Sequence, residues 1–462
     1  MKRYNNVLEM IGNTPIIRVQ NLDTGPCELY LKLENTNPGG SIKDRIALHM
    51  IEAAEARGDL KPGSTLVEGT AGNTGLGLAL VAQSKGYRLV LVIPDKMSRE
   101  KIATLKAMGA EVIITRSDVQ KGHPEYYQDL AKQVAADIDA DGGQAYFINQ
   151  FANPDNPDAH ELTTGPEMWS QMEQDLDAVV VGVGSSGTIT GLSRYFANTA
   201  PELELVLADP EGSILADYIA TGQLPADAGG WLVEGIGEDF LPSISDFSRI
   251  RTAYSITDRE SFEMARALLE KEGLMGGSST GTLVAAALRY CQAQTQPKRV
   301  LSMVCDTGNR YLSKVYNVYW LREHGLIDGS NHGDLRDLIA RPMASRDAVV
   351  VGAHENLSNA YKRMMLYDIS QLPVMDNDRI VGLIDESDIL VAVYQDEACF
   401  ARPVSSAMVT DLEFVNVHAT MDELLPIFNR DHVAIVMDED QFLGLITRID
   451  LLNFLRARAN RQ

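Results

Sequence analysis

The chain has 462 residues, 45% of them hydrophobic, which is enough for a large core and two or three domains. Its 41 basic and 64 acidic residues give a net charge of -23, which argues against nucleic acid or anionic membrane surfaces as partners. No apolar run reaches the roughly 18 residues of a membrane span, and the four cysteines have no metal-binding or disulfide spacing. We therefore expect a cytoplasmic protein without a metal site.

Strand-like apolar segments alternate with helix-length amphipathic stretches up to about residue 327. This alternation predicts an α/β fold with a parallel sheet. The predicted strands are 65–69, 88–94, 111–116, 177–184, 203–210 and 299–306.

The segment NPGGSIKDR, residues 37–45, places a lysine in the first turn of a predicted helix. Ser41 and Asp44 match a capping box, so the helix is predicted to begin at Ser41. The positive end of the helix dipole and burial beside two glycines would both lower the pKa of Lys43 and favour a nucleophilic amine. An ordinary solvated lysine is the alternative.

The segment EGTAGNTGLGLAL, residues 68–80, follows a predicted strand and begins another helix. Its backbone and side-chain donors would suit the carboxylate of a substrate, whereas a simple packing turn is the alternative. These donors come from Thr70, Gly72, Asn73 and Thr74.

The segment VVVGVGSSGTITG, residues 179–191, predicts an anion-binding turn at a helix N-terminus. The backbone N–H groups that would hold a phosphate belong to Gly184, Ser185, Ser186, Gly187 and Thr188. The glycines at positions 182–187 also spell GxGxxG, and Asp209 follows the next predicted strand. An NAD-dependent oxidoreductase therefore remains an open alternative from spacing alone.

A third glycine-rich turn, GLMGGSSTGT at residues 273–282, puts Ser278 at or near the N-cap of a helix. Taken alone, it reads as a plain helix cap. Together, however, a nucleophilic lysine, a phosphate cup and a carboxylate-sized loop are what a pyridoxal phosphate enzyme acting on an amino acid requires.

The order of these motifs resembles that of the cystathionine β-synthases, which belong to the β-family (fold type II) of pyridoxal phosphate enzymes. The resemblance covers nearly the whole chain and is carried by NPGGSIKDR, GTAGNTG, PDKMSREK, GSSGTITG, DPEGS, VEGIGEDFLP and EGLMGGSSTGT. It implies two open twisted α/β subdomains within a catalytic domain at residues 1–325.

The resemblance also implies roles for individual residues. Lys43 would form the Schiff base with pyridoxal 5'-phosphate, Asn73 would contact the ring 3-hydroxyl, and Ser278 would bond the pyridine nitrogen. Gly184 to Thr188 would hold the cofactor phosphate. The substrate would be bound or bordered by Thr70, Ala71, Gly72, Thr74, Gln150, Gly235, Gly237 and Glu238.

The implied reaction is a β-replacement in which serine and homocysteine form cystathionine and Lys43 transfers the α-proton. Cysteine as first substrate would release hydrogen sulfide. Two departures bear on specificity, since Ala71 stands where many relatives have serine and Glu238 where animal and fungal synthases have tyrosine. Cysteine synthase, which uses O-acetylserine and sulfide, is the alternative, although PDKMSREK with Lys96 looks more like the cystathionine enzyme.

The animal enzymes carry an N-terminal haem-binding segment, and this chain starts directly at the catalytic domain. Haem is therefore not expected, and a homodimer or larger homo-oligomer is expected by resemblance. His49 and His160 are interpreted as packed or surface histidines without a catalytic role.

A glycine-rich linker at 326–334 precedes an internal repeat, in which residues 373–390 align without a gap on 435–452. The repeat predicts two β-β-α units packed on each other, at 335–396 and 397–462, and it resembles the paired CBS domains of a Bateman module. By that resemblance Thr447 and Asp450 would bind an adenosine-type effector, with Asp385 and Asp388 at the matching positions. A purely structural assembly module is the alternative.

Overall fold

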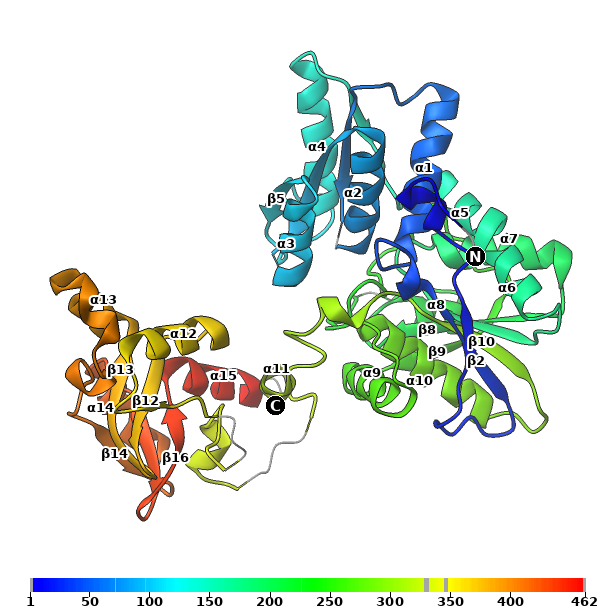
Figure 1. The fold of residues 1–462 in the computed structure, drawn as a ribbon. Coiled ribbons are helices and arrows are strands. Elements are labelled where there is room, and N and C mark those ends of the chain that lie inside the picture. The colour runs from blue at the N-terminus through cyan, green and yellow to red at the C-terminus, as the bar shows by residue number, and fades with distance from the viewer. Residues whose placement is uncertain are drawn as a thin grey trace. The chain divides into compact units, whose positions relative to one another are not determined.

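The computed structural model describes residues 3–70, 72–95, 97–225, 227–327, 332–344 and 348–459 (Figure 1). Contacts within the chain divide it into two compact units, Met1–Val318 and Tyr319–Gln462. We call these the first unit and the tail unit. The domain boundaries predicted from the sequence stay a prediction.

The first unit contains a six-stranded sheet with the order β1-β2-β10-β7-β8-β9. Strand β1 pairs with β2 in the antiparallel sense, and all other neighbours are parallel. Its strands are β1 (Ile16–Arg18), β2 (Glu28–Leu33), β7 (Ala178–Gly182), β8 (Glu204–Pro210), β9 (Ile250–Ile256) and β10 (Arg299–Val304).

A second sheet in the first unit has four parallel strands in the order β5-β4-β3-β6. Its strands are β3 (Thr65–Gly69), β4 (Arg88–Pro94), β5 (Glu111–Thr115) and β6 (Ala145–Phe147). Two separate, mainly parallel sheets confirm the predicted pair of α/β subdomains. The six strands predicted from apolar runs are all present, whereas β1, β2, β6 and β9 were missed.

Helices connect the strands of the first unit. They are α1 (Lys43–Arg57), α2 (Asn73–Lys85), α3 (Arg99–Ala107), α4 (Tyr127–Ala140), α5 (Asp155–Ala159), α6 (Gly165–Gln171), α7 (Gly187–Thr199), α8 (Leu215–Thr221), α9 (Asp258–Glu272) and α10 (Ser278–Gln292). Helix α11 (Val318–Glu323) follows the last strand of the first unit, and all of it except Val318 belongs to the tail unit. A π-helix at His160–Thr164 lies between α5 and α6.

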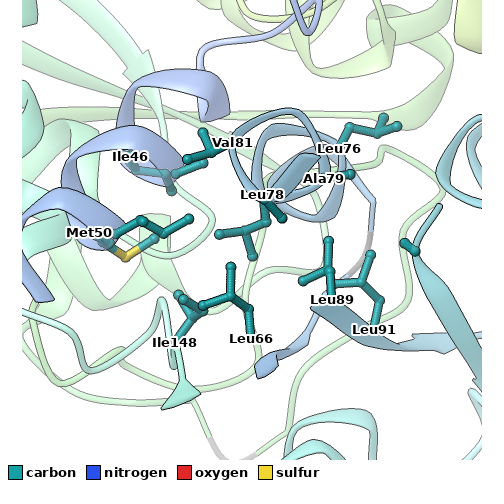
Figure 2. Close-up of a cluster of buried hydrophobic side chains, with 14 of the residues drawn as sticks. Ile46, Met50, Leu66, Leu76, Leu78, Ala79, Val81, Leu89, Leu91 and Ile148 are labelled. Atoms are coloured by element: carbon teal, nitrogen blue, oxygen red, sulfur yellow. The ribbon is translucent and has the colours of Figure 1, made fainter. Parts of the chain in front are cut away.

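The core of the smaller subdomain holds α1 and α2 against β3 and β4 (Figure 2). Its labelled side chains include Ile46 and Met50 of α1, Leu76 and Leu78 of α2, Leu66 of β3, and Leu89 and Leu91 of β4. Helices α1 and α2 lie so close that a Cβ on Gly77 would be 2.9 Å from the Lys43 carbonyl oxygen. This packing fixes the first turn of α1 and therefore the position of Lys43.

The tail unit contains two three-stranded sheets with matching pairings, β11-β12-β13 and β14-β15-β16. The bulge in the first hairpin falls at Val374/Met375 and that in the second at Val436/Met437, which are equivalent positions of the repeat. The strands are β11 (Val351–Gly352), β12 (Gln371–Asp376), β13 (Arg379–Asp385), β14 (Glu413–Asn416), β15 (Ala434–Asp438) and β16 (Gln441–Ile446). The internal repeat is confirmed.

Each repeat is larger than the predicted β-β-α unit, because a strand and a helix precede its hairpin. The helices of the tail unit are α12 (Leu357–Tyr367), α13 (Glu386–Gln395), α14 (Met421–Asn429) and α15 (Arg448–Ala459). Met375, Ile435 and Phe442 form a shared apolar cluster, so the two repeats pack on each other as predicted. In the described ranges, no helix is both long and apolar enough to cross a membrane.

Candidate active site

Lys43 is the first residue of α1, as the sequence predicted to within the first turn. Its helix start is held against the end of β10, because the Ile42 N–H donates to the Cys305 carbonyl at 2.9 Å and Ser41 forms a bridge with Asp306. Burial lowers the pKa of the Lys43 ammonium, while Cys305, Glu238 and Asp306 act in the opposite direction. The net effect favours the free amine.

The predicted capping box at this helix is wrong. The helix begins at Lys43 after Ile42, and the Ser41 hydroxyl accepts from the Lys43 N–H at 3.2 Å instead of reaching Asp44. The Asp44 carboxylate turns back and accepts from the Gly39 N–H at 2.5 Å. The double glycine bends the chain so sharply that its own N–H competes successfully for the carboxylate that was expected to cap the helix.

The predicted carboxylate loop stands at the start of α2, where Gly72 has the positive φ of 128° that favours glycine. Thr74 Oγ1 donates to Gln150 Oε1 at 2.7 Å, and this bond leaves the Gln150 NH2 group to face other acceptors. The Thr70 hydroxyl accepts from the Gly72 N–H at 3.2 Å. Ala71, which was predicted to bind substrate, lies outside the described residues, as does Lys96.

Both polar atoms of the Asn73 side-chain amide have a hydrogen-bond partner in the protein. Its Nδ2 donates to Asp306 Oδ2 at 2.7 Å, and its Oδ1 accepts from Arg310 Nη1 at 3.1 Å. Neither partner was found from the sequence, because both come from more than 230 positions further along the chain.

The predicted phosphate turn joins β7 to α7, and α7 begins at Gly187, so the first N–H groups of this helix have no acceptor within it. Ser186 adopts a left-handed conformation with φ of 71°. The Ser185 hydroxyl accepts from Asn156 Nδ2 at 3.0 Å, and Ser245 donates to the Ser186 hydroxyl at 2.7 Å. These bonds orient both serine side chains of the turn.

His160 contacts this turn, although sequence reasoning gave it no role. Its ring is fully buried, with Nε2 at 3.2 Å from Thr188 Oγ1 and Nδ1 at 2.9 Å from Thr164 Oγ1. Burial lowers its pKa well below the ordinary value, and so do the nearby charges of Lys43, Arg45 and His49. His160 is therefore neutral at physiological pH, and the predicted packed histidine is confirmed.

Asp209, the acidic residue that an NAD-binding site would need, is not placed to bind a ribose. Asp209 is fully buried, and its Oδ2 accepts from the Ala216 N–H at 2.8 Å. Burial raises its pKa to about 6. A carboxyl group turned inward to the start of α8 does not offer its oxygens to a ribose.

Ser278 is the first residue of α10, with Gly277 as the N-cap. Its hydroxyl is buried and accepts from the Glu234 N–H at 3.0 Å, so its own proton is left to donate to another acceptor. A pyridine nitrogen is such an acceptor.

The turn from Gly235 to Gly237 lies directly against the phosphate turn. The Gly237 N–H donates to the Val183 carbonyl at 2.8 Å, and a Cβ on Gly184 would be 2.6 Å from the Gly235 carbonyl oxygen. Glu238 follows this turn, and its charge raises the pKa of Lys43. The turn therefore precedes a carboxylate whose charge acts on the reactive amine.

The residues of the first unit fit pyridoxal 5'-phosphate. The phosphate turn is a cradle that tolerates only glycine at position 187, because a Cβ there would lie 1.8 Å from Asn156 Oδ1. Asn73 and Ser278 supply donors, and Lys43 supplies the nucleophile. They would hold the ring oxygen, the ring nitrogen and the aldehyde carbon respectively.

The tail unit contains a cavity of about 480 Å³, lined by residues of both repeats. Thr447 and Asp450 line it, together with Arg341, His432 and Arg448. Thr447 Oγ1 donates to Asp450 Oδ2 at 2.6 Å as part of the N-terminal cap of α15.

The matching pair in the first repeat also forms a cap. Asp385 and Asp388 make the capping box of α13, and neither is among the residues that line the cavity. The role of both pairs in effector binding stays a prediction.

Comparison with protein families agrees with this site. The family described as pyridoxal-phosphate dependent enzyme matches residues 7–306, and the CBS domain family matches residues 336–395 and 404–457. The first unit is thus a pyridoxal phosphate-dependent enzyme, and the tail unit is a pair of CBS domains.

Individual relatives show which pyridoxal phosphate-dependent enzymes this chain is similar to. Cystathionine β-synthase of Apis mellifera is 34% identical over 97% of this chain and 90% of its own length. Cysteine synthase of Staphylococcus aureus is 38% identical over 68% of this chain and 96% of its own length. The crystal structure of the O-acetylserine-dependent cystathionine β-synthase of Helicobacter pylori is 36% identical, with a TM-score of 0.63 over 69% of this chain and all of that one.

The chain belongs to the cystathionine β-synthase family of pyridoxal phosphate-dependent enzymes.

Proposed function

We propose that the enzyme condenses L-serine with L-homocysteine to cystathionine. The observation that carries this proposal is the match to a cystathionine β-synthase along 97% of the chain, tail unit included, whereas the cysteine synthase match covers only 68%. When bound, pyridoxal phosphate supplies an electron sink for the substrate α-carbon.

Residues of the chain transfer the proton, bind the substrate carboxylate and donate to the cofactor ring. The free amine of Lys43 takes the proton from the α-carbon and later returns it, which its lowered pKa favours. The Gln150 NH2 group, oriented by Thr74, and the backbone N–H group of Thr74 bind the substrate carboxylate. Ser278 donates to the ring nitrogen without carrying charge, a weaker electron withdrawal that favours β-replacement over transamination.

Glu238 supports homocysteine as the second substrate. Its carboxylate acts on Lys43 electrostatically. A negative charge there attracts the ammonium group that homocysteine carries and hydrosulfide lacks. We therefore assign Glu238 to the binding of the second substrate.

The alternative is an enzyme that uses O-acetylserine as the first substrate. The similar H. pylori enzyme is O-acetylserine-dependent, and the S. aureus relative is a cysteine synthase. The same scaffold would then release acetate instead of water and accept either homocysteine or sulfide.

A competition assay tests the proposal. Purified holoenzyme is given serine and O-acetylserine, each with a different isotope label, together with homocysteine and sulfide, and the products are identified by mass spectrometry. We expect cystathionine that carries the serine label. Cystathionine or cysteine that carries the O-acetylserine label would support the alternative. Cysteine offered alone should release hydrogen sulfide.

We also propose that the tail unit binds an adenosine-type effector in its cavity. The volume of about 480 Å³ lies in the usual range for small-molecule sites, and Asp450 offers carboxylate oxygens to ribose hydroxyls. Arg341 adds positive charge for a phosphate or carboxylate.

Calorimetric titration with S-adenosylmethionine, AMP and ATP tests this site. The replacement Asp450→Ala should abolish the heat of binding, whereas Asp388→Ala removes the matching cap carboxylate outside the cavity and should leave binding intact. Loss of binding in both variants would contradict the assignment, and no heat from any of the three ligands would favour an assembly module. Light scattering of the purified protein tests the expected homodimer or larger oligomer.

A further inference from the structure

Asp306, which follows the C-terminal end of β10, contacts residues at or next to three of the predicted cofactor contacts, Lys43, Asn73 and Ser278. It pairs with Ser41, two residues before Lys43, and its carbonyl accepts from the Gly277 N–H at 3.3 Å, one residue before Ser278. Its side chain is fully buried and binds Asn73 directly at 2.7 Å. One carboxylate therefore lies at the junction of three separate elements of the site.

The amide of Asn73 can satisfy its two protein partners in only one orientation. Asp306 accepts the hydrogen bond at 2.7 Å, so the group facing it must be the NH2, and Arg310 is a donor, so the group facing it must be the oxygen. One Nδ2 hydrogen remains, and the amide can present it to the ring 3-oxygen. In the opposite orientation, the amide oxygen would face that ring oxygen and repel it.

Asp306 is itself held by a chain of buried groups. The Tyr311 hydroxyl donates to Asp306 Oδ2 at 2.5 Å, and Lys101 Nζ donates to the Tyr311 hydroxyl at 3.0 Å. Lys101 also donates to Glu234 Oε2 at 2.7 Å. Glu234 in turn donates its N–H to Ser278, so the chain joins the two residues expected at opposite edges of the cofactor ring.

The side chains in this hydrogen-bonded series include charged groups, and they are almost completely buried. Lys101 and Tyr311 are 2% and 1% exposed, and the ammonium of Lys101 lies 4.5 Å from the centre of the Tyr311 ring. Lys314 provides a second cation for Glu234 at 2.8 Å. Although burial opposes ionisation, these two lysines keep the pKa of Glu234 below its ordinary value. Hydrogen bonds in such an environment are strongly directional.

We propose that Asp306 is a positioning residue, which, supported by Tyr311 and Lys101, holds the Asn73 amide so that its NH2 group faces the 3-oxygen of the cofactor ring. The inference rests on the proposed function, which requires bound pyridoxal phosphate, and on the predicted contact of Asn73 with that oxygen. Asp306 acts through Asn73 and touches neither the substrate nor the cofactor.

The absorption spectrum of the bound cofactor and its dissociation constant test the proposal. In Asp306→Leu holoenzyme, the visible absorption of the lysine-bound cofactor should shift from the form with an ionised ring oxygen toward the neutral form. The dissociation constant for pyridoxal phosphate should rise about tenfold or more, as expected for losing one hydrogen bond to a charged group. Asp306→Asn keeps an acceptor oxygen and should give an intermediate shift.

A double-mutant cycle separates positioning from a general structural effect. In the Asn73→Ala background, Asp306→Leu should cause no additional spectral shift. An equally large additional shift would overturn the inference while leaving the role of Asn73 intact. If Asn73→Ala alone changes neither spectrum nor affinity, the contact in the proposed function fails, and the inference fails with it.

Tyr311→Phe provides a milder variant if Asp306→Leu does not fold. Its matched control is Tyr290→Phe, because Tyr290 is also buried, binds Lys298 at 2.8 Å and has that ammonium 5.2 Å from its ring. Both variants should keep the melting temperature within a few degrees of each other, and only Tyr311→Phe should shift the cofactor spectrum. Equal spectra in the two variants would contradict the support assigned to Tyr311.

Discussion

Glu68 in β3 carries a buried carboxyl group next to the loop that orients Gln150. It is 1% exposed, and its Oε2 accepts from the Asn149 N–H at 2.7 Å. Burial raises its pKa to about 8, although hydrogen bonds from Asn149 and Gln150 act in the opposite direction. At neutral pH Glu68 is therefore protonated in the folded protein.

The sign of the pH effect follows from proton uptake. The ordinary pKa of this group is 4.5, so between pH 4.5 and 8 the unfolded chain loses a proton that the folded protein keeps. Stability must then fall as the pH rises through this window, with no penalty below it and a constant penalty above it. From pH 5 to pH 7 the loss is about 2.5 kcal/mol.

The replacement Glu68→Gln removes this titration and keeps an acceptor for the Asn149 N–H. Urea denaturation followed by circular dichroism should show that the variant gains about 2.5 kcal/mol relative to wild type between pH 5 and pH 7, with unchanged m-values. Exposed Glu111 of β5 gives the control, where Glu111→Gln should change stability by less than about 0.5 kcal/mol. An advantage of Glu68→Gln that is the same at both pH values would refute the reasoning from burial.

Three further replacements test the site. Lys43→Ala should lower turnover by a factor of about 1,000 or more, measured as product formed with excess cofactor; unchanged turnover would remove Lys43 from the mechanism. Glu238→Gln removes a charge that raises the pKa of Lys43, so capture of the cofactor by apoenzyme should continue to lower pH than in wild type, and a shift to higher pH would contradict this. Gly187→Ala places a Cβ 1.8 Å from Asn156 Oδ1 and should weaken cofactor binding about tenfold to hundredfold, whereas Gly230→Ala meets nothing within 4 Å and should bind normally.

Features determined by residues close in sequence could be predicted. The strands from β3 to β10 that are continuous apolar runs were all found, because fully buried parallel strands have that pattern. Lys43 and the phosphate turn were found because a helix start and its glycines lie within a few residues of each other. Strand β9 was missed because the five central residues of its seven are only half-buried or exposed, which weakens the apolar signal.

Features that depend on distant residues could not be predicted. Asp306 ends a recognised strand and Lys101 ends the quoted motif PDKMSREK, yet nothing in their local sequence indicates that Tyr311 joins them. The contact of His160 with Thr188 likewise joins two segments 28 positions apart. The capping box at Ser41 failed for a different reason, since the residues matched the pattern but the Asp44 carboxylate accepts from the Gly39 N–H instead.

Every role proposed for the first unit depends on Lys43 carrying the cofactor. Reduction of the holoenzyme with borohydride makes the linkage permanent, and trypsin then cuts after Lys32 and Arg45. The mass of the reduced cofactor should appear on the peptide LENTNPGGSIKDR, residues 33–45, with Lys43 uncut. The same mass on a peptide that contains Lys101, or on any other lysine, would contradict the assignment of the site.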